Sequence, residues 1–122
     1  MRKIEFRGRS LKGNWCYGDL IQSTDKVYIK TKSKKEEVDP ETVGQKICYK
    51  DDILPDIYEG DILEYEEYGT HKGVFTYDRD CFSFYIHRIT SSNTYKVWFN
   101  REYLTKIFEK KSGKISGNIY NK

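Results

Sequence analysis

Apolar and polar residues alternate along most of this chain, which is the pattern of β-strands that bury one face. The clearest example follows a Gly60-Asp61 pair, after which Leu63 and Tyr65 point to one side and glutamates to the other. We expect Leu63 and Tyr65 to be buried. We also expect Gly60 to adopt a positive φ and Asp61 to accept a hydrogen bond from the turn.

The alternation predicts two groups of short strands. In the first group, three strands joined by short turns predict a small β-meander, at residues 3–9, 15–22 and 27–31. In the second group, which begins at residue 57, strands are expected at residues 62–67, 73–77, 81–86, 95–99, 104–109 and 114–120. Short strands in this number form a barrel or roll more readily than an open sheet, because closure removes unpaired edges.

A one-turn helix is predicted between the two groups. Asp39 suits the N-cap, Pro40 the first helical position and Gly44 the left-handed position after the helix. Residues 46–56 are expected to form an irregular connection, and Asn100 to cap a further single turn. We therefore predict an all-β protein, with a β-rich N-terminal segment at residues 1–56 and an SH3-like barrel at residues 57–122.

The composition is consistent with sheets and with a cytoplasmic protein. There is no alanine, and 16% of the residues are aromatic, which suits pleated sheets. An A+T-rich genome would produce a similar composition, so both explanations stay open. Cys16, Cys48 and Cys81 are odd in number and far apart, so we expect reduced thiols in the cytoplasm. Neither a signal peptide nor a membrane span is expected, because no apolar run is long enough.

Few residues suggest catalysis. Cys81 and His87 would form a conceivable nucleophilic pair, although a strand cysteine beside aromatic residues usually belongs to a core. The cysteines, His71 and His87 lack the spacing of metal ligands, and there is no glycine-rich phosphate loop. We interpret the carboxylates of residues 59–67 as the solvent-exposed face of one strand. We therefore expect no enzymatic activity, no cofactor and no metal.

Charge and aromatic residues suggest binding. Residues 51–80 are acidic and both flanking segments are basic, within a net charge of +3. We expect a non-catalytic module that binds a host protein or a second copy of itself, because tyrosine gives large contact area at low entropy cost. Opposite charge blocks and spare strand edges also predict self-association. The candidate partner-binding residues are Tyr95, Arg101, Tyr103, Lys106, Lys110 and Lys111.

Nucleic-acid binding is the alternative function. Lysines at residues 26–35 and 106–114 would contact phosphates, and nearby aromatic residues would stack on bases. Trp98 and Phe99 point to opposite faces of one strand, so at least one of them is expected in the core.

Several segments resemble motifs of the YopX family of phage and prophage proteins. In order along the chain, they are Met1–Gly8, Trp15–Leu20, Val38–Gln45, Ile57–Leu63 and Ile115–Tyr120. Residues 46–56 depart from the family pattern. The resemblance implies an SH3-like barrel in the C-terminal half, phage or prophage origin and a cytoplasmic setting in a bacterial host. It implies no catalytic residues.

Overall fold

The structure, a computed structural model, describes residues 4–89, 94–110 and 112–120. The chain divides into two compact units, Met1–Lys46 and Ile47–Lys122. Strands dominate both units, so the all-β prediction is confirmed. The boundary falls earlier than the predicted one after residue 56, because Cys48 and Leu54 are buried in the core of the second unit.

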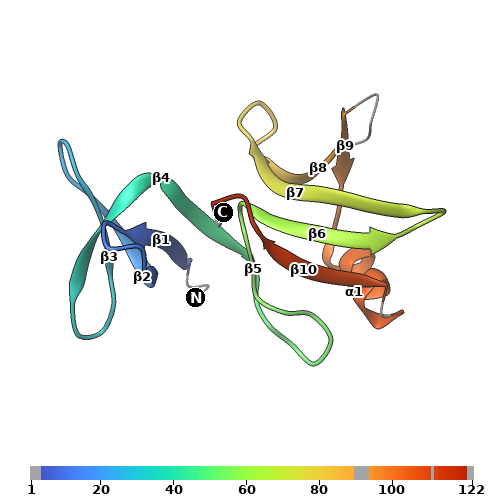
Figure 1. The fold of residues 1–122 in the computed structure, drawn as a ribbon, viewed down its shortest axis with the longest axis horizontal. Coiled ribbons are helices and arrows are strands. Elements are labelled where there is room, and N and C mark those ends of the chain that lie inside the picture. The colour runs from blue at the N-terminus through green and yellow to red at the C-terminus, as the bar shows by residue number, and fades with distance from the viewer. Residues whose placement is uncertain (1–3, 90–93, 111, 121–122) are drawn as a thin grey trace. The chain divides into compact units, whose positions relative to one another are not determined.

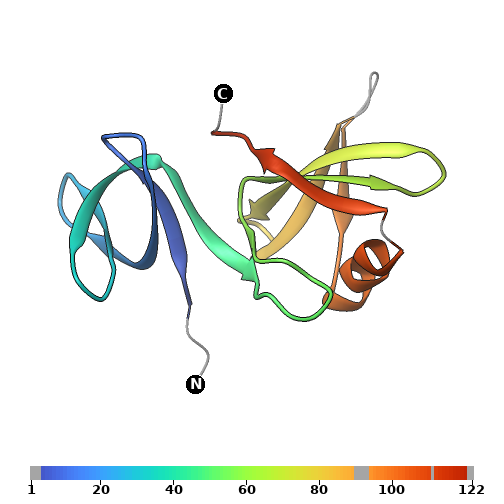
Figure 2. The ribbon, with the colours of Figure 1, turned by 60° about the horizontal axis from the view of Figure 1, so that its bottom comes forward.

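The first unit is a small closed β-barrel (Figure 2). Its strands are β1 (Phe6–Ser10), β2 (Trp15–Gln22), β3 (Val27–Lys30) and β4 (Lys35–Cys48), whose end lies in the second unit. Each strand pairs antiparallel with the next, and β1 also pairs with β4, which closes the ladder. Ile29 and Val38 are buried in this unit. The predicted meander is therefore present, and a fourth strand closes it into a barrel.

The predicted one-turn helix at Asp39–Gly44 is wrong, because these residues lie within β4. The hydrogen bonds to Asp39 that favour a turn are nevertheless present. Glu41 N donates to Asp39 Oδ1 at 3.0 Å, and Thr42 Oγ1 donates to the Asp39 carbonyl oxygen at 2.7 Å. These bonds form a bulge, where the register with β1 shifts, and Arg9 N donates to Thr42 Oγ1 at 2.8 Å.

The second unit is built on one five-stranded antiparallel sheet, and the SH3-like character expected of it stays a prediction. Its elements are β5 (Ile57–Tyr58), β6 (Asp61–Glu66), β7 (Thr70–Asp78), β8 (Ser83–Ile89), β9 (Thr94–Trp98), α1 (Arg101–Glu109) and β10 (Gly113–Asn118). The strand order of its sheet is β10-β6-β7-β8-β9, so the last strand lies beside the first (Figure 1). β5 instead neighbours β4.

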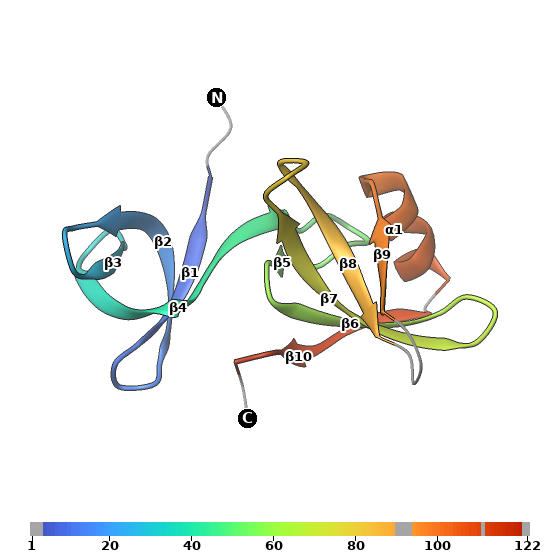
Figure 3. The ribbon, with the colours of Figure 1, turned by 90° about the horizontal axis from the view of Figure 1, so that it is seen from above.

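α1 (Arg101–Glu109) corrects two predictions, since the sequence suggested a single turn followed by a strand at residues 104–109. Asn100 caps the helix as expected, and its Oδ1 accepts from the backbone N–H three residues later at 2.8 Å. The buried residues Leu104 and Ile107 are three apart, which is a helical and not a strand spacing. At 9 residues the helix is shorter than three turns, and it contacts β10 (Figure 3).

The turn before β6 has the predicted geometry. Gly60 has a φ of +93°, and Tyr58 N donates to Asp61 Oδ2 at 2.8 Å. Leu63 and Tyr65 are 0% and 1% exposed, which confirms the face on which β6 is buried.

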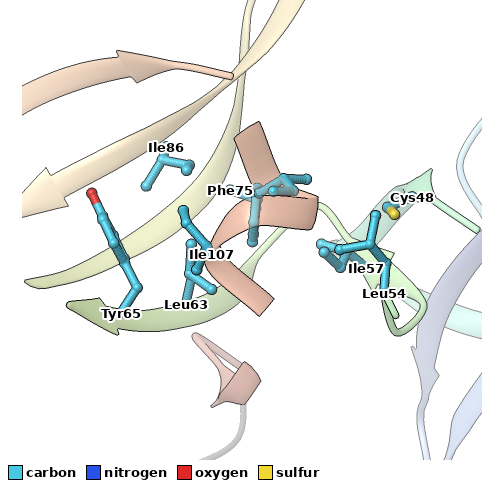
Figure 4. Packing of buried hydrophobic residues seen from close by; sticks show 9 residues of the cluster. Cys48, Leu54, Ile57, Leu63, Tyr65, Phe75, Ile86 and Ile107 are labelled. Carbon is cyan, nitrogen blue, oxygen red and sulfur yellow. The ribbon is translucent and has the colours of Figure 1, made fainter. Parts of the chain in front are cut away.

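Apolar side chains from the sheet, α1 and the segment before β5 form the core of the second unit (Figure 4). The buried members are Cys48, Leu54, Ile57, Leu63, Tyr65, Phe75, Ile86, Leu104 and Ile107. Phe99 packs edge-on against Phe75 with ring centroids 5.3 Å apart, whereas Trp98 is 47% exposed. Phe99 therefore packs against the core, as the sequence predicted for at least one of Trp98 and Phe99. No helix among the described residues is long and apolar enough to cross a membrane.

Candidate partner-binding hollow

A hollow of about 460 Å³ opens between α1 and the tip of the β6–β7 hairpin. Figure 2 shows α1 and this tip at the same end of the second unit. We call this feature the α1 hollow. Its lining residues are Glu66, Glu67, Tyr68, Tyr103, Lys106, Ile107, Lys110 and Ser112. Three residues predicted to bind a partner, Tyr103, Lys106 and Lys110, therefore come together here.

The helical wall of the α1 hollow is basic. Lys106 lies on α1 and Lys110, four residues later, is its C-cap residue, so both project from one side of the helix. Lys106 Nζ lies 3.5 Å from Glu102 Oε1, but both side chains are mostly exposed, and such a pair binds weakly. Both ammonium groups are thus accessible to a ligand in the hollow. Lys111, predicted to join them, lies outside the described residues.

The tip of the hairpin exposes an aromatic side chain in an unusual backbone conformation. Tyr68 is fully exposed and has a φ of +55°, and Gly69 has a φ of +127°. Both residues belong to the three-residue loop at positions 67–69, because Glu66 and Thr70 are the last paired residues of the two strands. A bulky residue rarely adopts a positive φ, and backbone strain of this kind concentrates at functional sites. Tyr68 is therefore the most distinctive residue on the rim.

Polar groups lie at the inner end of the α1 hollow. Tyr103 Oη donates to Glu67 Oε2 at 3.0 Å. Burial, together with this bond to Glu67, raises the pKa of Tyr103, so its phenol remains protonated and acts as a donor. The Tyr65 hydroxyl, and then the charges of Glu67 and Tyr103, raise the pKa of Arg88, so these groups lie close together. Tyr65 Oη and Arg88 Nε are both buried, and neither has a hydrogen-bond partner among the described residues.

His71 ties the base of the hairpin to the same region. Its Nε2 donates to the carbonyl oxygen of Glu67 at 2.8 Å, which fixes the backbone next to Tyr68. Its ring lies 5.4 Å from the Tyr65 ring, measured between centroids. The histidine thus supports the hairpin through contacts with a backbone group and a ring.

Two of the predicted binding residues lie elsewhere. Arg101 Nη2 donates to Asp51 Oδ2 at 2.6 Å and to the Tyr49 carbonyl oxygen at 3.4 Å, so this arginine fastens the segment before β5 to α1. The Tyr95 ring, on β9, lies against the guanidinium of Arg88, whose Cζ is 5.4 Å from the ring centroid. Both side chains make contacts that serve the fold.

The structure does not bring Cys81 and His87 together. Cys81 is exposed in the turn before β8, whose first residue is Ser83. His87 lies further along β8, opposite Val74, about 13 Å from Ser83 at the usual rise of a strand. Within residues 4–89, 94–110 and 112–120, no group of three His, Cys, Asp or Glu side chains is arranged to hold a metal ion.

Three of the five lysines at residues 26–35 lie close to a carboxylate or a ring of the first unit. Lys26 and Lys34 lie 3.9 and 3.2 Å from glutamate oxygens of β4, and Lys35 Nζ lies 4.5 Å from the centre of the Tyr28 ring. Acidic side chains next to these lysines reduce the attraction for phosphates. This region therefore favours nucleic-acid binding less than its sequence suggested.

Two residues of the α1 hollow, Glu67 and Tyr68, were not predicted as a site, and neither were the buried residues Tyr65 and Arg88 next to them. Two signals in the sequence point to them. Gly69, between two alternating segments, marks a hairpin loop, which would expose the neighbouring Tyr68. Arg88 follows Ile86 at a spacing of two, which places a charged side chain on the inward face of a strand.

Comparison with known proteins gives no match to a family model, to a curated protein or to a solved structure.

Proposed function

We propose that this protein is a non-catalytic binding module that holds a protein partner in the α1 hollow. The observation that carries this proposal is Tyr68, a fully exposed tyrosine with a left-handed backbone, at the rim of a hollow that also contains Tyr103 and two lysines. Tyrosine and cationic side chains around a concave surface are typical of protein interfaces.

We also propose phage or prophage origin and action in the cytoplasm of a bacterial host. The support is the ordered series of YopX-like segments, of which Val38–Gln45 matches the family motif throughout. In the structure this segment forms the bulged part of β4. Its polar residues therefore serve the first barrel and not the α1 hollow.

The proposal is tested by selecting peptides from a random display library on the whole chain and measuring their affinity by fluorescence anisotropy. Tyr68→Ala and the double variant Lys106→Glu/Lys110→Glu should each weaken binding at least about tenfold, which corresponds to about 1.4 kcal/mol. Phe82→Ala is the matched control, because Phe82 is also an exposed aromatic residue with positive φ, at the β7–β8 turn. Lys12→Glu, at an exposed turn, controls for charge.

The controls should bind within about twofold of the parent chain, which is less than about 0.4 kcal/mol. Equal losses in hollow and control variants, or failure to select any peptide, would contradict the proposal. Two further measurements distinguish the alternatives. Sedimentation at low salt tests binding of a second copy. Titration with single-stranded DNA at two salt concentrations tests nucleic-acid binding, which should be strongly salt-dependent if it occurs.

A further inference from the structure

Two buried polar groups lie next to Glu67 and Tyr103, which line the α1 hollow. Tyr65 Oη and Arg88 Nε are buried without a hydrogen-bond partner in the described part of the chain. The Tyr65 residue is 1% exposed, and Figure 4 shows its hydroxyl directed away from Leu63. A buried donor without an acceptor loses its hydration and gains nothing in return. The arrangement is therefore suited to a further acceptor.

Glu67 is the acceptor that already reaches this region. Its Oε2 accepts from Tyr103 Oη at 3.0 Å, and its charge also acts on Arg88. Glu67 itself is exposed, in the last position before the left-handed Tyr68. An exposed side chain held through one carboxylate oxygen can be displaced by a ligand.

We propose that Tyr65, Arg88 and Tyr103 form a carboxylate-binding site, that Glu67 partly occupies it from within the chain, and that a carboxylate of the partner replaces Glu67. This inference rests on the proposed function of the α1 hollow, whose ligand it specifies. Two phenol hydroxyls and a guanidinium supply donors to both oxygens of a carboxylate. Lys106 and Lys110 on the adjacent wall favour further acidic groups of the same partner.

A truncated variant tests the site directly. Glu67→Ala removes the atoms Cγ, Cδ, Oε1 and Oε2, which together have the shape and charge of acetate. Acetate should therefore raise the unfolding temperature of Glu67→Ala in a saturable manner, compared with sodium chloride at equal ionic strength. Acetamide, its neutral analogue, should have no such effect. The parent chain should respond more weakly, because Glu67 competes for the site.

Two variants act as controls. Glu109→Ala removes the same charge from an exposed residue of α1 that does not line the α1 hollow, and it should respond to acetate no more strongly than the parent chain. In Glu67→Ala, the further change Arg88→Gln should abolish the response. If that double variant is unfolded, Tyr103→Phe replaces Arg88→Gln, because it removes one donor and keeps the ring. An acetate response in Glu109→Ala that exceeds that of the parent chain, or none in Glu67→Ala, would overturn the proposal.

Two small probes identify the source of the carboxylate. N-acetylglutamate amide has its charge on the side chain, whereas N-acetylglycylalanine has it at the C-terminus. Binding of either probe to Glu67→Ala, measured by calorimetry, supports the site and shows which source it accepts, and binding of neither contradicts it. If Glu67→Ala does not respond to acetate but the parent chain still binds the display-selected peptide, this site alone is refuted. If Glu67→Ala responds to acetate but no display-selected peptide binds the parent chain, the proposed function is refuted.

Discussion

Replacement of Tyr68 by glycine should make the protein more stable and its binding weaker. A non-glycine residue in the left-handed region costs about 1–2 kcal/mol. Glycine avoids that cost but adds about 0.5–1 kcal/mol of conformational entropy lost on folding. The Tyr68 side chain is fully exposed, so its removal sacrifices little buried surface. The net expectation is a stabilisation of about 0.5–1 kcal/mol, which for a unit of this size raises the unfolding temperature by about 2–8 °C.

Calorimetry and peptide binding, measured on the same preparation, separate the two effects. Tyr68→Gly should unfold at a higher temperature and bind the selected peptide at least about tenfold more weakly, a loss of about 1.4 kcal/mol. Phe82→Gly is the matched control: Phe82 has a φ of +53° and is 82% exposed, so its replacement should stabilise the fold and leave the affinity unchanged. A less stable Tyr68→Gly would refute the strain argument, and an unchanged affinity would refute the binding role.

Three further predictions concern the fold. Gly60→Ala should lower the free energy of unfolding by about 2 kcal/mol or more, because the φ is +93° and the new Cβ would lie 2.8 Å from Tyr120 Cε2. An unchanged melting temperature would contradict this prediction. Leu104→Ala should cost about 2–5 kcal/mol in denaturant unfolding, since Leu104 is 2% exposed, and a loss below about 1 kcal/mol would show that α1 is not anchored by this residue. The pKa of Asp51 is lowered from 3.8 to about 2 by the backbone N–H groups of Leu54 and Ile53, and then by Arg101. The ionised Asp51 therefore stabilises the fold above about pH 4, and this contribution is lost as the pH falls towards 2. Asp51→Asn should therefore lose less stability between pH 4 and pH 2 than the parent chain, and equal acid sensitivity would argue against this role.

Most strands could be predicted from the sequence because alternation is a local property of the chain. The error at residues 39–44 has a clear cause. Asp39 and Pro40 favour a tight turn whether it opens a helix or interrupts a strand, and the local sequence is the same in both cases. The hydrogen bond from Arg9 N to Thr42 Oγ1, between residues 33 apart in sequence, selects the bulge. The error at α1 was avoidable, because Leu104 and Ile107 already have helical spacing.

The candidate site was predictable to the extent that its residues are neighbours in sequence. Lys106 and Lys110 come together because one helix carries both. Arg101 belonged to the same cluster in sequence, but its guanidinium donates to Asp51, which lies 50 residues earlier in the chain. Glu67 meets Tyr103 across 36 residues of chain, which only the sheet and α1 together could bring about. Contacts of this kind depend on tertiary packing and leave little local trace.

The central claim, that the α1 hollow holds the partner, is tested most directly by amide NMR of the whole chain during titration with a selected peptide. The account predicts that the largest shifts occur in two segments, residues 66–70 of the hairpin tip and residues 103–110 of α1, and that they are absent from the first unit. Shifts concentrated instead around Trp98 on β9, or on the lysines of residues 26–35, would contradict it.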